Sequence, residues 1–196
     1  MEPESTDTGL NPEATDAAGS GPTGSDANRK DGTARSFMIV FNISKKANFG
    51  FLIRTANAFG AELICIGRRS YSAGGAVPGT RHTKVHRFYT LDEGIEFARS
   101  VGCSIAGIEI SKDSKSIWDQ PFQGPTAFMV GNEGQGLSQR QIEMCDYLVQ
   151  IPQYGDGASI NVNVAAGIVL GHFAHWAGYR PNEVLGHKFY ADEPDE

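Results

Sequence analysis

Three polar segments of the sequence combine glycines with side chains that can bind ligands or take part in catalysis. They are N-x-G-x-x-x-R from Asn48 to Arg54, GNEGQGLS from Gly131 to Ser138, and IPQYGDGASINVN from Ile151 to Asn163. Glycine-rich turns expose successive backbone N–H groups and let the main chain approach a ligand closely. GNEGQGLS is neither a Walker loop, which needs Gly-Lys-Ser/Thr, nor a G-x-G-x-x-G fingerprint. The first and third segments also have a structural interpretation, with Asn or Ser capping helices and Arg54 on the surface.

The elements that must position these segments alternate between strands and helices. Continuous β-prone runs such as SFMIVFNI and ELICIG are typical of strands covered on both faces, and helical spacing of apolar residues separates them. We expect strands at 36–43, 62–67, 85–89, 103–110, 126–131 and 147–151, and helices at 48–60, 91–101, 137–146 and from Val162 onward. This alternation predicts an α/β fold with an open, mostly parallel sheet and helices on both faces. The polar segments follow strands, where such sheets bind ligands.

The helix that begins at Val162 is apolar around nearly its whole circumference. It must therefore be buried on two sides, and we expect one side to meet its own sheet and the other a second copy of the chain. Gly167 and Gly171, four residues apart, would let another backbone approach closely. Polar residues interrupt the run, so it is not a membrane span. These residues are Asn161, Asn163, His172 and His175.

Length and composition indicate one folded domain with two tails. The chain has 196 residues, of which 40% are hydrophobic. We expect a disordered acidic tail over 1–35, which has scarcely an apolar side chain to bury, a folded domain over 36–180 and a C-terminal tail over 181–196. The formal net charge is −6, but residues 1–33 carry −5 and residues 191–196 carry −4, which leaves +3 between them. The folded part is thus mildly basic, and a polyanionic partner is not excluded.

Cysteine usage and the N-terminus indicate an intracellular protein. Cys65, Cys103 and Cys145 are scattered singly through apolar segments, as expected of reduced core thiols. The N-terminus has no apolar signal region and is acidic, unlike a transit peptide, so we expect a cytoplasmic location, with the nucleus not excluded. No metal site is expected, because His172 and His175 have no carboxylate or cysteine beside them.

The loop between the second and third strands is the best candidate for contact with a polyanionic partner such as RNA. It combines cations with flexible glycines at 74, 75 and 79. The cationic candidates are Arg68, Arg69, Arg81 and Lys84, together with His82. A solvated loop without a partner is the alternative interpretation.

Taken together in this order, the three segments resemble the motifs of a known family. NFGFLIR, VGNEGQGL and IPQYGDGASINVNVAAGI are similar to the first, second and third motifs of the SPOUT superfamily of methyltransferases, in its tRNA/rRNA ribose 2'-O-methyltransferase (SpoU-type) branch. The similarity runs over essentially all of 37–178. It implies a C-terminal trefoil knot, which is an exception to the rule that folds are unknotted. It also implies a homodimer through the last helix.

The resemblance further implies a cofactor and roles for individual residues. S-adenosylmethionine would lie in a bent form against the second and third segments. The cofactor-binding positions implied are Val130, Gly131, Asn132, Gly134, Gly136, Ile151, Pro152, Ala158, Ile160 and Asn161. Arg54 aligns with the catalytic arginine of the family. The polar residues that align around the reacting ribose and the methionine part of the cofactor are Asn48, Glu133, Ser159 and Asn161. At Asn163 the sequence departs from the family, which more often has Ser or Thr.

The reaction implied is methyl transfer to a ribose 2'-hydroxyl of a structured RNA, tRNA before rRNA. This hydroxyl is a poor nucleophile, whereas the methyl group on the sulfonium of S-adenosylmethionine is activated. Alignment of the two groups can therefore lower the reaction barrier considerably, by about 7–11 kcal/mol in well-oriented intramolecular reactions. Arg54 would be the base or, since a guanidinium is almost never deprotonated in proteins, would hold the adjacent phosphate and orient the 2'-oxygen. Two other functions stay open: an RNA-binding protein of this fold without catalysis, and a base methyltransferase.

Overall fold

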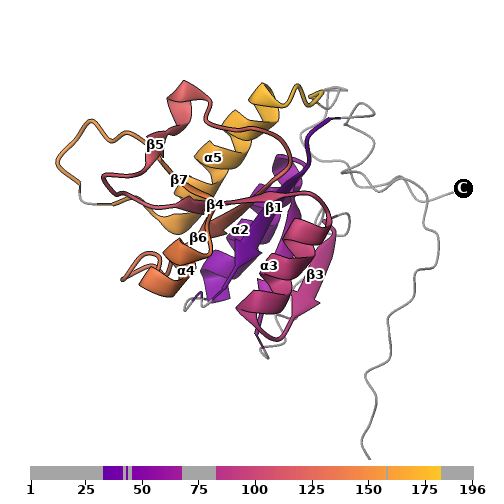
Figure 1. Cartoon of the computed structure of the whole chain (residues 1–196). Helices are drawn as coiled ribbons and strands as arrows, with labels where there is room; N and C mark the ends of the chain where they lie inside the picture. Colours follow the sequence, from indigo (N-terminus) through magenta and orange to yellow (C-terminus); the bar gives the residue numbers. More distant parts are fainter. Residues whose placement is uncertain (1–32, 42, 44–45, 68–82, 158, 182–196) are drawn as a thin grey trace, which may run out of the picture.

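A computed structural model describes residues 33–41, 43, 46–67, 83–157 and 159–181, and its centre is a seven-stranded sheet (Figure 1). The strand order is β3-β2-β1-β6-β4-β7-β5, and every pair of neighbours is parallel. The strands are β1 (Ser36–Val40), β2 (Glu62–Ile66), β3 (Val85–Phe88), β4 (Ser104–Ile108), β5 (Lys115–Ser116), β6 (Thr126–Val130) and β7 (Tyr147–Gln150). The predicted parallel α/β class is confirmed. All six predicted strands are present, and the sequence missed only β5, because a two-residue strand is too short to leave a pattern.

Helices cover both faces of the sheet, as predicted (Figure 1). The helices are α2 (Lys46–Ala58), α3 (Leu91–Ser100), α4 (Gln139–Glu143) and α5 (Val162–Trp176). α2 and α5 pack with one buried cluster, and α3 and α4 with the other. Gly60, with φ +67°, follows the end of α2 in the left-handed conformation that the sequence indicated. α4 is shorter than the helix predicted over 137–146, since Ser138 caps its start and it ends before Met144.

Segments of its own chain cover α5 on both sides. The sequence assigned Gly167 and Gly171 to contact with another backbone of a second subunit, and this expectation is wrong. An added Cβ at Gly167 would lie 3.6 Å from Thr55 Cγ2, and one at Gly171 would lie 3.0 Å from Phe59 Cε1, so both glycines face α2. The connection between β4 and β6 covers another side of α5, where Phe122 lies 5.2 Å from the Phe173 ring. This enclosure is consistent with the knot implied by the resemblance, which stays a prediction.

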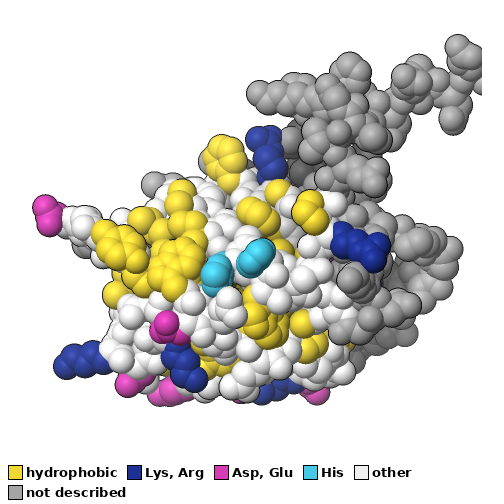
Figure 2. Space-filling view, turned by 90° about the horizontal axis from the view of Figure 1, so that it is seen from above, with side chains coloured by type: hydrophobic (Ala, Val, Ile, Leu, Met, Phe, Trp, Pro, Cys, Tyr) yellow, Lys and Arg dark blue, Asp and Glu magenta, His cyan; other side chains and the backbone are white. Residues whose placement is uncertain are grey.

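An apolar surface remains at the C-terminal end of α5, beside the short 3₁₀ helix η2 (Ile117–Asp119). The Trp118 ring is 45% exposed and packs edge-on against His172, with 5.2 Å between centroids. Figure 2 shows that hydrophobic side chains gather on this face of the molecule, around histidine side chains. α5 therefore buries one stripe of side chains, Ala166, Val169, Leu170 and Phe173, and leaves apolar surface on other sides, including the surface at its C-terminal end.

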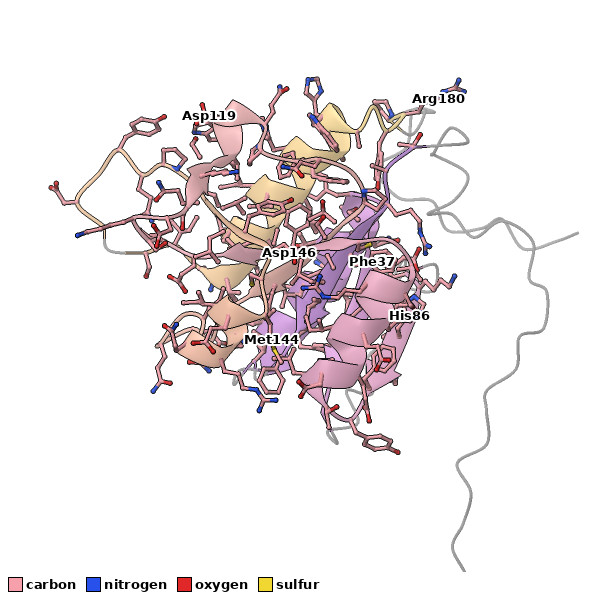
Figure 3. All side chains as sticks on the ribbon, viewed as in Figure 1. Phe37, His86, Asp119, Met144, Asp146 and Arg180 are labelled. Atoms are coloured by element: carbon pink, nitrogen blue, oxygen red, sulfur yellow. The ribbon has the colours of Figure 1, made fainter. Side chains whose placement is uncertain are left out.

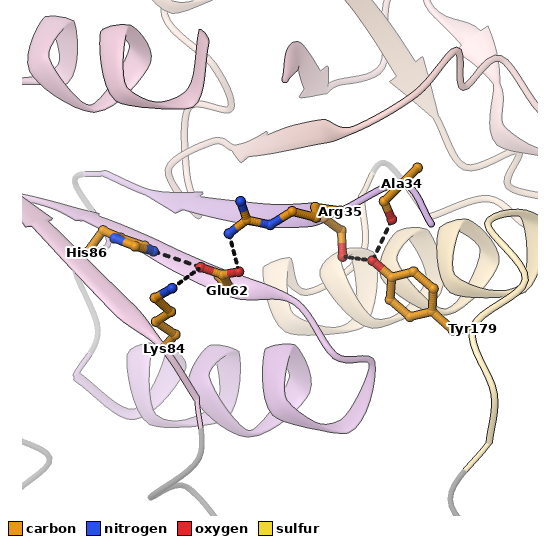
Figure 4. A network of polar contacts seen from close by, with 7 residues as sticks. Ala34, Arg35, Glu62, Lys84, His86 and Tyr179 are labelled. Atoms are coloured by element: carbon orange, nitrogen blue, oxygen red, sulfur yellow. Dashed lines mark hydrogen bonds and ion pairs between the residues drawn. The ribbon is translucent and has the colours of Figure 1, made fainter. Parts of the chain in front are cut away.

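The amino end of the sheet contains a buried carboxylate, Glu62, which is 1% exposed. Arg35 and His86 donate hydrogen bonds to it, and the Lys84 Nζ lies 3.9 Å away (Figure 4). Burial raises the pKa of Glu62, but the hydrogen bonds from His86 and Arg35 and the nearby positive charges outweigh it and lower the pKa from 4.5 to about 2. Glu62 therefore stays ionised in the folded protein and joins the first residues of β2 to the start of β1 and to β3.

Aromatic contacts support this charge cluster against α3. Figure 3 shows Phe37 and His86 beside this helix, and both rings contact Phe97, with centroid distances of 6.2 and 4.4 Å. The Arg35 guanidinium lies 4.8 Å from the centroid of the Phe37 ring. The Tyr179 hydroxyl donates to the Ala34 carbonyl at 2.9 Å and ties the chain after α5 to the start of β1. The contacts at the amino end of the sheet thus hold its strands, α3 and the segment after α5 together.

Replacing Glu62 by Gln should destabilise the protein and change its response to acid. The variant leaves Arg35 and His86 without their carboxylate, which should cost about 3 kcal/mol at pH 7. Because the folded pKa of Glu62, about 2, lies below its ordinary 4.5, its contribution is present above pH 4.5 and lost as the pH falls toward 2. Chemical denaturation from pH 7 to pH 2 should show wild type losing more stability than Glu62→Gln.

Asp92→Asn is the matched control for this experiment. Asp92 pairs with Arg140 on the surface, where the two side chains are 61% and 70% exposed. Such pairs contribute less than about 1 kcal/mol, so this variant should stay close to wild type. Equal losses in the two variants would contradict a structural role for Glu62.

Candidate active site

A cavity of about 610 Å³ opens at the carboxyl ends of β4, β6 and β7, beside the first turns of α2 and α5. Its lining comes from all three polar segments and from the end of β4. The lining residues are Asn48, Ile108, Glu109, Ile110, Val130, Gly131, Asn132, Glu133, Gly134, Gln135, Gly136, Gln150, Ile151, Gln153, Ser159, Ile160, Asn161, Val162 and Ala165. The structure thus brings most of the predicted site residues together around one cavity.

The loop after β6 forms one wall of the cavity through a tight turn. The backbone N–H groups of Asn132 and Gly136 each donate to the carbonyl of the other, at 3.0 and 2.9 Å. Gly136 has φ +69°, and a Cβ added at Gly131 would lie 2.3 Å from the Gly136 carbonyl carbon. Neither position could hold a larger residue without moving this loop. The two glycines are therefore required by the turn itself.

A series of side-chain hydrogen bonds joins the three polar segments beside the cavity. The Asn48 Nδ2 donates to Glu133 Oε1 at 2.7 Å, and the Asn163 Nδ2 donates to Asn48 Oδ1 at 3.0 Å. Asn161 accepts from the backbone N–H of Asn163 at 2.8 Å and caps α5, as the sequence indicated. Asn48 is 7% exposed and lies inside α2, so the interpretation of Asn48 as a helix cap is wrong.

Several predicted residues lie away from the cavity wall or outside the described residues. Arg54 is exposed on α2 and does not line the cavity, and half-buried Pro152 follows Ile151 without lining it. The other predicted residues, Ala158, Arg68, Arg69, Arg81 and His82, lie outside the described part of the chain. The placement of Lys84 beside the site is wrong. Lys84 precedes β3 and pairs with Glu62, at the amino end of a parallel sheet whose carboxyl ends form the cavity.

Cysteine and metal chemistry receive no support from the described residues. Cys65, Cys103 and Cys145 are free thiols, in agreement with the sequence. Burial raises the pKa of Cys65 and Cys103 to about 11 and that of Cys145 to about 12, so these thiols are protonated at neutral pH. Within the described ranges, no group of three or more His, Cys, Asp or Glu side chains could hold a metal ion, and no helix is long and apolar enough to cross a membrane.

Comparison with known proteins identifies the family. The model of the SpoU rRNA Methylase family matches residues 35–171, which contain all three polar segments. The chain belongs to this family. A tRNA/rRNA methyltransferase of Mycolicibacterium smegmatis, described as uncharacterized, is 31% identical over 152 residues, covering 74% of this chain and 48% of the relative. A putative TrmH family tRNA/rRNA methyltransferase of Bacillus subtilis is 29% identical over 140 residues, covering 68% of this chain and 56% of the relative. The chain thus spans about half the length of these curated relatives.

Solved structures of the SpoU family share the fold. The TrmH/SpoU tRNA modifying enzyme of A. aeolicus has a TM-score of 0.64 and 25% identity, covering 81% of this chain and 84% of that one. The SpoU methyltransferase AviRb of Streptomyces viridochromogenes, solved in complex with AdoMet, has a TM-score of 0.59 and 25% identity, covering 74% and 58%. The SPOUT type of parallel α/β fold that the resemblance implied is therefore confirmed.

Glu109 lines the cavity, and the sequence analysis missed it. Its carboxylate accepts from the backbone N–H of Leu137 at 2.7 Å and from that of Ile110 at 3.0 Å. It also packs against Gly136, where an added Cβ would lie 2.4 Å from Glu109 Oε2. The available signal was an acidic residue near the end of a predicted buried strand, CSIAGIEI. Glu109 thus holds the loop after β6 against the end of β4.

Replacing Glu109 by Gln should loosen the loop after β6. A glutamine side chain has one acceptor oxygen, so its NH₂ would face one of the two N–H donors, at a cost of about 1–3 kcal/mol. Hydrogen exchange measured by mass spectrometry should show faster exchange over residues 131–138. Glu143→Gln is the control, because Glu143 is exposed, accepts a surface hydrogen bond from Gln139 and does not line the cavity. Unchanged exchange over 131–138 in Glu109→Gln would contradict this role.

Proposed function

We propose that this chain is an S-adenosylmethionine-dependent RNA methyltransferase that modifies a ribose 2'-hydroxyl of a structured RNA, with tRNA favoured over rRNA. The observation that carries the proposal is the single cavity lined by all three polar segments at the carboxyl ends of the sheet. Membership of the SpoU family and the tRNA/rRNA methyltransferase names of its relatives support RNA as the substrate. The chain covers 84% of the tRNA modifying enzyme of A. aeolicus, and this similarity supports tRNA as the substrate.

The cavity fits S-adenosylmethionine in size and in the chemistry of its lining. Its volume of about 610 Å³ is typical of a site for a small molecule or cofactor. Ile108, Ile151 and Ile160 offer apolar surface that would suit an adenine ring, and Glu109 and Glu133 place negative charge on the cavity wall, which would favour a ligand that carries a positive sulfonium. The residues proposed to hold the cofactor are Val130, Gly131, Asn132, Gly134, Gly136, Ile151, Pro152, Ala158, Ile160 and Asn161.

S-adenosylmethionine supplies a methyl group that is already activated for transfer, so the chain must mainly align the ribose. Asn48 and Glu133 are held by hydrogen bonds at the cavity wall, and Ser159 and Asn161 line it from the third segment. These polar side chains can orient the ribose and its neighbouring atoms, since positioning contributes much of the rate in such reactions. The proton of the ribose 2'-hydroxyl is released to water or to a group on the RNA side of the site.

Arg54 is assigned to the RNA side. It lies six residues beyond Asn48 on α2, about 9 Å further along the helix, and is exposed outside the cavity lining. A guanidinium at this place can bind the phosphate next to the reacting ribose through two parallel hydrogen bonds. Arg68, Arg69 and Arg81 are proposed as further RNA contacts, whereas Lys84 is not retained.

We also propose that the protein forms a homodimer through α5 and acts in the cytoplasm. α2 and α5 leave apolar side chains exposed, with Phe51 52% and Val164 51% accessible, and the end of α5 adds the surface around Trp118. Exposed apolar side chains of this kind are typical of subunit interfaces. The dimer proposal rests on this surface and on the resemblance, because the chain's own segments bury only Ala166, Val169, Leu170 and Phe173 of α5.

The proposed reaction predicts one class of product. Incubation of total RNA with radiolabelled S-adenosylmethionine and the protein, followed by digestion to nucleosides, should place the label on 2'-O-methylated nucleosides. Label on a methylated base would instead establish a base methyltransferase. Binding of S-adenosylmethionine without labelling of any RNA would favour an RNA-binding protein that has lost catalysis.

Arg54 and Asn161 should respond differently to substitution. Arg54→Lys keeps the charge but loses the planar pair of donors, so single-turnover methylation should fall while calorimetry shows unchanged affinity for S-adenosylmethionine. Asn161→Ala removes the cap of α5, at a cost of about 1 kcal/mol, and should weaken cofactor binding itself. Arg140→Lys, at an exposed position of α4, is the control and should leave both measurements unchanged. Wild-type methylation by Arg54→Lys would overturn the assignment of Arg54.

A further inference from the structure

We infer that Asn163 is a positioning residue that acts through Asn48 to fix the orientation of the Glu133 carboxylate at the cavity. The three side chains come from α5, α2 and the loop after β6, and two hydrogen bonds of 3.0 and 2.7 Å join them in series. Asn163 itself is not part of the cavity lining, whereas Asn48 and Glu133 are. Asn163 therefore acts on a ligand only through its neighbours. We call this series the amide relay.

The direction of the amide relay follows from the chemistry of its members. An ionised carboxylate only accepts hydrogen bonds, so Asn48 must turn its NH₂ group toward Glu133. The Asn48 oxygen then faces Asn163, which must turn its own NH₂ group toward Asn48. A reversal of either amide would bring two oxygens together. The negative charge of Glu133 thus sets the orientation of the Asn48 amide and, through it, the orientation of the Asn163 amide.

A buried atom at the end of the amide relay supports this interpretation. The Asn163 Oδ1 is buried and has no hydrogen-bond partner among the described residues. A buried acceptor without a donor is unfavourable, and such atoms are uncommon in folded proteins. The opposite amide orientation would turn this oxygen toward the Asn48 oxygen, which is worse. The contact with Asn48 therefore sets the orientation of the Asn163 amide, and this orientation leaves the Asn163 oxygen without a donor.

The consequence for function rests on the proposed cofactor. Asn48 is 7% exposed and held between Glu133 and Asn163, so the carboxylate is fixed relative to the first turns of both α2 and α5. A fixed, ionised carboxylate at the cavity wall can receive the positively charged part of S-adenosylmethionine without rearrangement. The Asn163 side chain thereby contributes to cofactor affinity without touching the cofactor.

Reversal of the relay by Asn163→Asp tests the inference. The two side chains have nearly the same shape, but an aspartate cannot donate to Asn48. The Asn48 oxygen must then face one of two carboxylates, and one of its two hydrogen bonds in the relay is lost. Calorimetry at pH 8 should show about tenfold weaker binding of S-adenosylmethionine. A protonated carboxyl group can donate, so the ratio of variant to wild-type affinity should recover as the pH falls and either the introduced aspartate or Glu133 takes up a proton. A loss that does not depend on pH would overturn the inference.

Rescue by Glu133→Gln separates the relay from a local structural role. Glutamine can accept from Asn48 or donate to it, so it can bond to Asn48 in either orientation. Asn163→Asp should therefore lower the affinity for S-adenosylmethionine about tenfold in the wild-type background. In the Glu133→Gln background it should lower this affinity less than about twofold. In an Asn48→Ala background, where the middle of the relay is missing, the coupling between positions 163 and 133 should vanish. Equal losses in all three backgrounds would overturn the inference.

Thermal unfolding of the same variants without cofactor distinguishes failure of the inference from failure of the proposed function. The relay exists in the ligand-free protein, so the melting temperatures should show the same coupling between positions 163 and 133, and the same absence of coupling in Asn48→Ala. If the wild-type protein does not bind S-adenosylmethionine, the proposed function fails and the unfolding data alone decide on the relay. Additive melting-temperature changes would overturn the relay whatever the protein binds.

Discussion

The hydrogen bonds of Asn48 to Glu133 and Asn163 connect parts of the chain that are 85 and 115 residues apart in sequence. They depend on the register of the central strands, in which Thr126 of β6 lies beside both Ser36 of β1 and Ser104 of β4. Because these strands start level and run parallel, their carboxyl ends lie at the same edge of the sheet. The polar segments after them can meet there only if β6, late in the sequence, is inserted between β1 and β4.

The placement of α5 is the second condition for this meeting. After β7, near one edge of the sheet, the chain returns to α2, so that the first turn of α5 lies beside the first turn of α2. Further along α5, Gly171 makes room for the Phe59 ring, which follows the end of α2, and aromatic side chains of the β4–β6 connection pack against the helix. Burial of the stripe Ala166, Val169, Leu170 and Phe173 explains one apolar side of α5 and fixes the capped start of the helix at the cavity wall.

Buried and half-buried carboxylates have different roles at the two ends of the sheet. At the amino end, Arg35 and His86 donate to Glu62, whose low pKa shows that these partners outweigh the cost of burial. At the carboxyl end, Glu109 is held by backbone N–H groups and Glu133 by the Asn48 amide, and both line the cavity. Backbone N–H groups fix the Glu109 carboxylate without cancelling its charge, which suits recognition of a cationic ligand. The first end therefore stabilises the fold, and the second can bind a ligand.

The sequence by itself determined the features that depend on local spacing: the alternation of strands and helices, the glycine after α2, the Asn161 cap of α5 and the three polar segments after strands. These follow from backbone preferences and periodicity within a few residues. Only the tertiary structure decided that Glu109 anchors the loop after β6, that Asn48 bonds to Asn163 rather than capping α2, and that Lys84 lies at the opposite end of the sheet. It also showed that Gly167 and Gly171 face α2. The reason is that these contacts follow from strand order and register, which bring distant residues together and leave no periodic pattern along the chain.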